Sequence, residues 1–157
     1  MNQIISTFDQ HFSQLHDRSC EIVQKTPLEK LYWQPLEKDA LFPINSCGEY
    51  ILRSAGKVEQ NFGGITTKLW DDPFEWTLPE QLSTNALILE YLAEVEATRK
   101  RGFALLQNDA DLQKNLPAPV KIISLFDLLL QTLTVAENYQ GRAIAIFRLI
   151  SDQKLHS

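Results

Sequence analysis

The alternation of apolar and polar residues is most regular over residues 121–151, KIISLFDLLLQTLTVAENYQGRAIAIFRLIS. On a wheel of 3.6 residues per turn, nearly every position in this stretch is apolar except for one narrow polar arc. An apolar surface this broad predicts one long helix that packs against partners on two flanks. The polar arc consists of Asp127, Gln131, Thr134, Asn138 and Arg142.

Two residues of this segment depart from a simple core pattern. Glu137 lies among leucine and isoleucine positions, where an ionised carboxylate needs a cation or hydrogen-bond donors. It is interpreted either as a helix-edge carboxylate near Arg148 or a partner's lysine, or as part of a binding site. Gly141 costs about 1 kcal/mol relative to alanine within a helix, which predicts close approach by a neighbouring backbone.

Two amphipathic segments open the chain. Residues 2–24 carry apolar side chains at i, i+3/i+4 and i+7 spacing, which predicts a first helix that ends at the Thr-Pro pair at 26–27. A second helix is expected to start at a cap on Asn45 or Ser46 and to end at the Gly-Gly pair at 63–64. On its polar side, Glu49 and Arg53 are one turn apart, where an ion pair is worth about 0.3–0.5 kcal/mol. Its predicted inner face consists of Cys47, Ile51, Ala55, Val58 and Phe62.

A third helix is expected from Ser83 or Thr84 to about Leu106, with Glu96 and Arg99 close enough to its inner face to pair there. Before it, TTKLWDDPFEWTLPE mixes turn residues with aromatic ones, which predicts an ordered loop held by aromatic burial, with a binding surface as the alternative. After it, NDADLQKNLPAP is expected to be a loop. Prolines at 27, 35 and 43 predict a prolonged connection between the first two helices.

Four long amphipathic helices in one chain of 157 residues predict an all-α fold, a four-helix bundle that forms a single domain over residues 1–157. The formal net charge of -5 argues against nonspecific binding of nucleic acid. Cys20 and Cys47 do not form a CxxC pair and are expected to be free cytosolic thiols. The N-terminus lacks the pattern of a secretion signal, and no apolar run is long enough to cross a membrane. We therefore expect a cytoplasmic protein without membrane or nucleic-acid partners.

The order of three signals resembles the DinB-like (DinB/YfiT) superfamily of helical bundles. They are TPLEKLYWQP after the first helix, SCGEYILRSAGKVEQ at the start of the second, and ENYQGRAIAIFRLI near the C-terminus. The resemblance covers almost the whole chain and implies a four-helix bundle with a long connection between helices one and two. In that family, a histidine on helix two and an H-x-x-x-H-x-G segment on helix four commonly hold a divalent metal. Characterised relatives include thiol-dependent transferases and other small-molecule enzymes.

Carried onto this chain, the resemblance matches Trp33, Pro35 and Gly141 but none of the histidines. The family's ligand positions fall on Arg53, Val135 and Tyr139. Arginine, valine and a protonated tyrosine cannot coordinate a divalent ion, and the chain's own histidines lie near its two ends without ligand spacing. We therefore expect neither a metal nor another cofactor. Metal binding through carboxylates and water is an open alternative.

Arg53 places a cation where relatives hold an ion, which predicts a cleft for a small polar or anionic ligand. A scaffold that dimerises through the broad apolar surface of helix four is equally open, so a homodimer is expected. The alternative is a thiol-dependent, transferase-like enzyme with a site rebuilt from Glu137, Tyr139 and Arg53. The catalytic residues of such an enzyme are unknown. The candidate ligand-binding residues are Arg53, Glu49, Gln131, Glu137, Tyr139 and Arg142.

Overall fold

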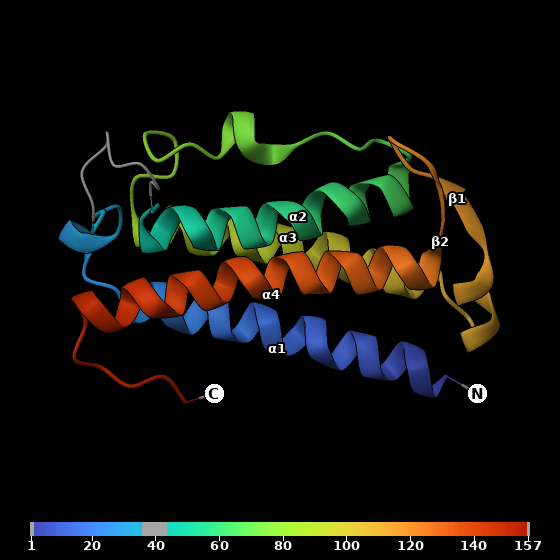
Figure 1. Ribbon diagram of the computed structural model, residues 1–157, viewed down its shortest axis with the longest axis horizontal. Coiled ribbons are helices and arrows are strands. Elements are labelled where there is room, and N and C mark those ends of the chain that lie inside the picture. Colours follow the sequence, from blue (N-terminus) through green and yellow to red (C-terminus); the bar gives the residue numbers. More distant parts are fainter. Residues whose placement is uncertain (1, 36–43, 157) are drawn as a thin grey trace.

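The computed structural model describes residues 2–35 and 44–156. Within these residues it contains four long helices: α1 (Gln3–Lys25), α2 (Cys47–Thr67), α3 (Asn85–Ala104) and α4 (Leu125–Ile150). They lie side by side with their long axes roughly aligned (Figure 1). α2 packs against α3 and α4, and α1 packs against α3 and α4 from the other side. The expected all-α class is confirmed, and α4 has neighbours on two flanks as predicted.

Side-chain caps explain where three of the helices begin. Ser46 accepts a hydrogen bond from the Glu49 amide and donates one to the Glu49 carboxylate, so α2 starts with a reciprocal cap. Thr84 accepts from the Leu87 amide at the start of α3, and Ser124 accepts from the Asp127 amide at the start of α4. These residues satisfy amides that have no partner within the helix, which sets the first turn of each helix.

The cap of α1 comes from a distant part of the chain. Asn2 makes no side-chain cap, but both carboxylate oxygens of Asp109 accept hydrogen bonds, one from the Ile4 amide and one from the Ile5 amide. Asp109 begins a short 3-10 helix, η3 (Asp109–Gln113), which follows α3. A carboxylate at this position also interacts favourably with the positive end of the helix dipole.

The Gly-Gly pair at 63–64 does not end α2, contrary to the prediction. The helix continues to Thr67 and ends at Lys68, which adopts the left-handed conformation with φ 65°. Gly64 is needed for packing, because a Cβ atom there would lie 2.3 Å from the indole of Trp70. The small residue lets the chain fold back closely over the helix that it has just left.

The prediction that residues 121–124 belong to the last helix is also wrong. Ile122–Ser124 form strand β2, which pairs antiparallel with β1 (Asn115–Pro117). The Leu125 amide donates to the Lys114 carbonyl, and this bond together with the Ser124 cap stops the helix from extending backwards. The segment predicted as a plain loop thus contains η3 and β1. All five residues of the predicted polar arc on α4 are exposed, as expected.

The two unusual residues of α4 have simpler explanations than the sequence suggested. Gly141 is exposed, and an added Cβ would meet nothing within 4 Å, so the predicted close backbone approach is wrong. Glu137 is 39% exposed and lies 3.5 Å from Arg18 on α1, so it is a helix-edge carboxylate paired with Arg18 rather than with Arg148.

The connection between α2 and α3 runs alongside α2 and contains a short 3-10 helix, η2 (Pro73–Trp76) (Figure 1). Trp70 is half-buried and Pro73 is buried, but Phe74 and Trp76 are 41% and 45% exposed. Aromatic burial therefore holds only the first part of this loop. Another 3-10 helix, η1 (Leu28–Lys30), follows α1, and Pro43 of the first connection lies outside the described residues.

The core lies between the four helices. Near its centre, Phe12 of α1 meets Phe62 of α2 edge-on, and Phe62 stacks on Phe103 of α3, with ring centres 5.2 and 5.5 Å apart. The predicted inner face of α2 is buried throughout. No helix in the described part of the chain has both the length and the apolar character needed to cross a membrane.

Candidate functional site

A groove runs along the outer side of α2, between α4 and the connection that contains η2. We call it the α2 groove. Its central pocket has a volume of about 120 Å³ and is lined by Arg53, Lys57 and Gln60 of α2, Tyr139 of α4, and Asp72 and Thr77 of the connection. A second pocket of about 90 Å³ adjoins it, shares Arg53 and Phe74 with it, and reaches Glu49. The connection runs alongside α2 (Figure 1) and contributes Asp72, Phe74 and Thr77 to the lining of the central pocket.

Arg53 is held by an aromatic ring and not by the predicted carboxylate. Its guanidinium carbon lies 3.7 Å from the centre of the Phe74 ring. Glu49 instead accepts hydrogen bonds from Ser46 at 2.9 Å and from Gln34 at 3.4 Å. Arg53 forms no ion pair with any described residue, so the predicted Glu49–Arg53 pair is wrong. Stacking uses the face of the guanidinium and leaves its N–H edge for other acceptors.

Lys57 is a second cation on the same wall. Its ammonium donates a hydrogen bond to the side-chain oxygen of Gln60 at 3.1 Å, and it too forms no ion pair within the described residues. Of the residues that the structure describes, Asp72 is the single carboxylate that lines the central pocket, and it accepts a hydrogen bond from the Phe74 amide. The central pocket therefore carries an excess of positive charge in a chain whose net charge is -5.

Tyr139 enters the groove from α4. Its ring stacks on Tyr50 of α2 with the ring centres 6.4 Å apart, and the guanidinium of Arg142 lies 5.5 Å from the ring centre of Tyr139 and 5.8 Å from that of Tyr50. Arg142 thus flanks the two tyrosines from the solvent side. Two of the three positions that the DinB-like resemblance assigns to metal ligands, Arg53 and Tyr139, therefore line one pocket.

Two other predicted site residues, Gln131 and Glu137, do not line the central pocket. Gln131 lines a further hollow near the start of α4, together with Lys57 and Gln60. Glu137 pairs with Arg18 of α1, whereas Tyr139 packs on α2, so the two side chains lie against different helices. This placement does not assemble the rebuilt catalytic site, which required Glu137 and Tyr139 to face a common pocket.

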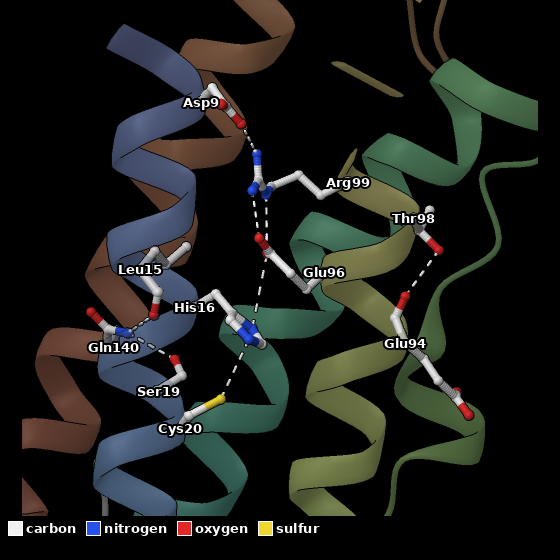
Figure 2. Close-up of polar contacts among 10 residues, drawn as sticks. All are labelled: Asp9, Leu15, His16, Ser19, Cys20, Glu94, Glu96, Thr98, Arg99 and Gln140. Carbon is white, nitrogen blue, oxygen red and sulfur yellow. Dashed lines mark hydrogen bonds and ion pairs between the residues drawn. The ribbon is translucent and has the colours of Figure 1, made fainter. Parts of the chain in front are cut away.

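A buried polar cluster between α1 and α3 is a second arrangement of chemically capable residues (Figure 2). The side chain of Arg99 is only 2% exposed and forms ion pairs with Glu96 on the same helix and with Asp9 on α1. His16 Nδ1 lies 3.9 Å from a Glu96 oxygen, and Cys20 Sγ lies 3.5 Å from His16 Nε2. The Glu96–Arg99 pair was predicted from its position near the inner face of α3, and it is confirmed.

The order thiol, imidazole, carboxylate in this cluster resembles the arrangement that activates a nucleophilic cysteine. Its electrostatics oppose that role. Burial, together with the nearby charges of Asp17 and Glu96, raises the pKa of Cys20 to about 11. The thiol is therefore protonated at neutral pH, and the cavity beside His16 and Glu96 is only about 20 Å³. We interpret the cluster as structural, a polar link between α1 and α3.

Sequence reasoning missed the α1 side of this cluster, although a signal existed. Asp9, His16 and Cys20 are spaced by seven and four residues and therefore lie on one face of α1. It also missed Gln140, a fully buried residue of α4, which donates to the Leu15 carbonyl and to Ser19 and accepts from Arg18. Among the described residues there is no group of three or more histidine, cysteine, aspartate or glutamate side chains arranged to hold a metal.

Comparison of the chain with models of protein families, with curated proteins and with solved structures found no match. The resemblance to DinB-like bundles is thus a prediction from the sequence.

Proposed function

We propose that this protein is a metal-free DinB-like bundle that binds a small anionic molecule in the α2 groove. The observation that supports it is the presence of Arg53 and Lys57 on one pocket wall without a carboxylate partner among the described residues. Both side chains are half-buried, and an anionic ligand would replace the water around them with charge-assisted hydrogen bonds.

The chemistry of the two cations favours a carboxylate or a phosphate. An arginine whose face rests on an aromatic ring is already ordered, so its N–H edge can form two parallel hydrogen bonds to such an anion at a small entropic cost. Lys57 adds a second charge about one helical turn away. The Tyr139 hydroxyl and the Gln60 amide, which line the same pocket, can donate or accept hydrogen bonds with the rest of the ligand.

Binding is a better description than the transferase-like alternative because Glu137, its proposed carboxylate, pairs with Arg18 away from Tyr139. A guanidinium at a position that holds a metal ligand in relatives would also repel a divalent cation. Elemental analysis of untagged protein tests this part of the proposal. Stoichiometric zinc or nickel would overturn it.

A homodimer through helix faces is a prediction that rests on the breadth of the apolar surface of α4. α1 and α2 cover two flanks of that helix, and it retains three exposed large apolar residues, Leu130, Val135 and Leu149. Val135 and Leu149 lie on nearly the same side of the helix, and Leu130 lies on another. Light scattering coupled to size-exclusion chromatography tests the prediction. A single monomeric species would remove it.

The groove itself is tested by NMR titration with short carboxylates and inorganic phosphate at low ionic strength. We expect saturable shifts of the amides of residues 52–60, weakened about tenfold in Arg53→Met, because a hydrogen bond to a charged group contributes about 1.5–3 kcal/mol. Arg148→Met is the matched control, since Arg148 is an exposed arginine in the last turn of α4. Absence of any saturable shift, or equal weakening in both variants, would overturn the proposed function.

A further inference from the structure

The α2 groove continues beyond its central pocket. Lys57 and Gln60 line that pocket and also a larger, open hollow of about 280 Å³ at the far end of α2. The two spaces are therefore neighbours that share one stretch of wall. The hollow is bounded by Trp70 of the α2–α3 connection, by the turn between β1 and β2, and by the start of α4.

The character of the wall changes along this path. Around Arg53 the lining is mostly polar, whereas most of the residues that bound the hollow are apolar. Val120 at the turn between the strands is 94% exposed. Exposed apolar residues are normal when they are scattered, but here exposed and half-buried apolar residues, together with the buried Ile123 and Leu128, line one depression that adjoins a cationic pocket. The apolar members are Trp70, Ala118, Pro119, Val120, Ile123 and Leu128.

Hydrogen bonds hold the boundary between the two spaces. Lys57 donates to the side-chain oxygen of Gln60 at 3.1 Å, and the side-chain nitrogen of Gln60 donates to the Trp70 carbonyl at 3.1 Å. Trp70 in turn packs directly over Gly64 of α2. The Gln60 side chain therefore links the Lys57 ammonium, at the end of the cationic pocket, to Trp70, at the start of the apolar wall.

We propose that the occupant of the groove is an amphipathic carboxylate, with its head group at Arg53 and Lys57 and its apolar chain in the hollow beside Val120. This inference rests on the proposed anion-binding function and adds an apolar chain to the anionic head group of the ligand. Charge complementarity places the carboxylate at the cations, and burial of methylene groups against the apolar wall places the chain. Lys121 and Gln131 at the edge of the hollow leave its outer side polar and hydrated.

Titration with butanoate, octanoate and octanol, each followed by NMR, separates the two halves. We expect octanoate to bind about tenfold more tightly than butanoate, because four additional methylene groups are partly removed from water. Octanoate and not butanoate should shift the amides of residues 120 and 123, while both should shift those of residues 53 and 57. Octanol should bind more weakly than octanoate.

Val120→Ser should weaken octanoate binding about threefold and leave butanoate binding unchanged. The control, Leu149→Ser, removes an exposed apolar side chain near the other end of α4 and should change neither. Equal affinities for butanoate and octanoate would overturn the apolar subsite and leave the anion site intact. Octanol binding as tightly as octanoate would overturn the head-group assignment. Failure of both acids to bind would overturn the proposed function itself.

Discussion

Arg99 and Glu96 lie one turn apart on α3 and are joined by two hydrogen bonds in a site from which water is almost excluded. The side chains are 2% and 11% exposed. The pair lies at the contact with α1, where Asp9 takes the remaining charge-assisted bond of the guanidinium at 2.5 Å (Figure 2). A buried ion pair of this kind contributes little net stability compared with apolar residues, but loss of one partner leaves a buried charge uncompensated.

Arg99→Met should therefore lower the free energy of unfolding by about 3–5 kcal/mol, because Glu96 loses its partner in a buried site. The double variant Glu96→Leu/Arg99→Met should recover most of this loss, since it removes both charges. Asp9→Asn is the control, with a cost below about 1 kcal/mol because the Asp9 side chain is 54% exposed. Chemical denaturation measures all three. A double variant no more stable than the single one would contradict the explanation.

Gln140→Leu should cost about 1–3 kcal/mol, because Gln140 is fully buried and its amide satisfies groups on α1 that leucine cannot. Gln131→Leu changes the same chemical group on an exposed position of α4 and should stay within about 0.5 kcal/mol of the wild type. Urea denaturation of the two variants gives the difference directly. Similar costs at both positions would show that the buried hydrogen bonds contribute nothing specific.

Two glycines provide a matched test of packing against helix propensity. Gly141→Ala should stabilise the protein by about 0.5–1 kcal/mol, since the position is exposed, helical and open around the new Cβ. Gly64→Ala should destabilise it, because its Cβ would lie 2.3 Å from the Trp70 ring and would displace that residue. Thermal unfolding and indole fluorescence report both effects. Stabilisation by both substitutions would refute the described contact between Trp70 and α2.

The thiol chemistry should depend on pH in a defined window. Burial raises the pKa of Cys20 from 9.0 to about 11 and that of Cys47 from 9.0 to about 12, so in the native state both thiols are protonated at neutral pH. Alkylation of the native protein at pH 7.5 should be slow and should accelerate as the pH approaches 11. The unfolded chain should react quickly at both cysteines.

The same shift has a consequence for stability. Above pH 9 the unfolded chain loses its thiol protons, while the folded protein retains that of Cys20 until about pH 11. The folded state then binds more protons, so the free energy of unfolding falls as pH rises through this interval. Cys20→Ala should make this decline shallower when unfolding is measured at several pH values. An unchanged slope would contradict the raised pKa.

The sequence alone determined the presence of the four helices and the buried face of α2, and it narrowed the caps of α2 and α3 to two adjacent residues each, because these features depend on side chains a few residues apart. Periodicity and capping involve residues that are close together in the chain, so they can be recognised from the sequence alone. The proximity of Glu96 and Arg99 and the exposed polar arc of α4 could be predicted for the same reason.

Only the tertiary structure decided the contacts of the residues that depart from the helical pattern or lie outside it. Gly64 and Gly141 have the same side chain within helices, but Trp70 folds back over one and solvent covers the other. Asp9 meets Arg99, and Asp109 caps α1, across intervals of 90 and 105 residues. Arg53 was expected to face Glu49 and instead stacks on Phe74 of a connection that periodicity does not describe. Such contacts depend on how the helices and loops pack together, and no local spacing encodes that packing.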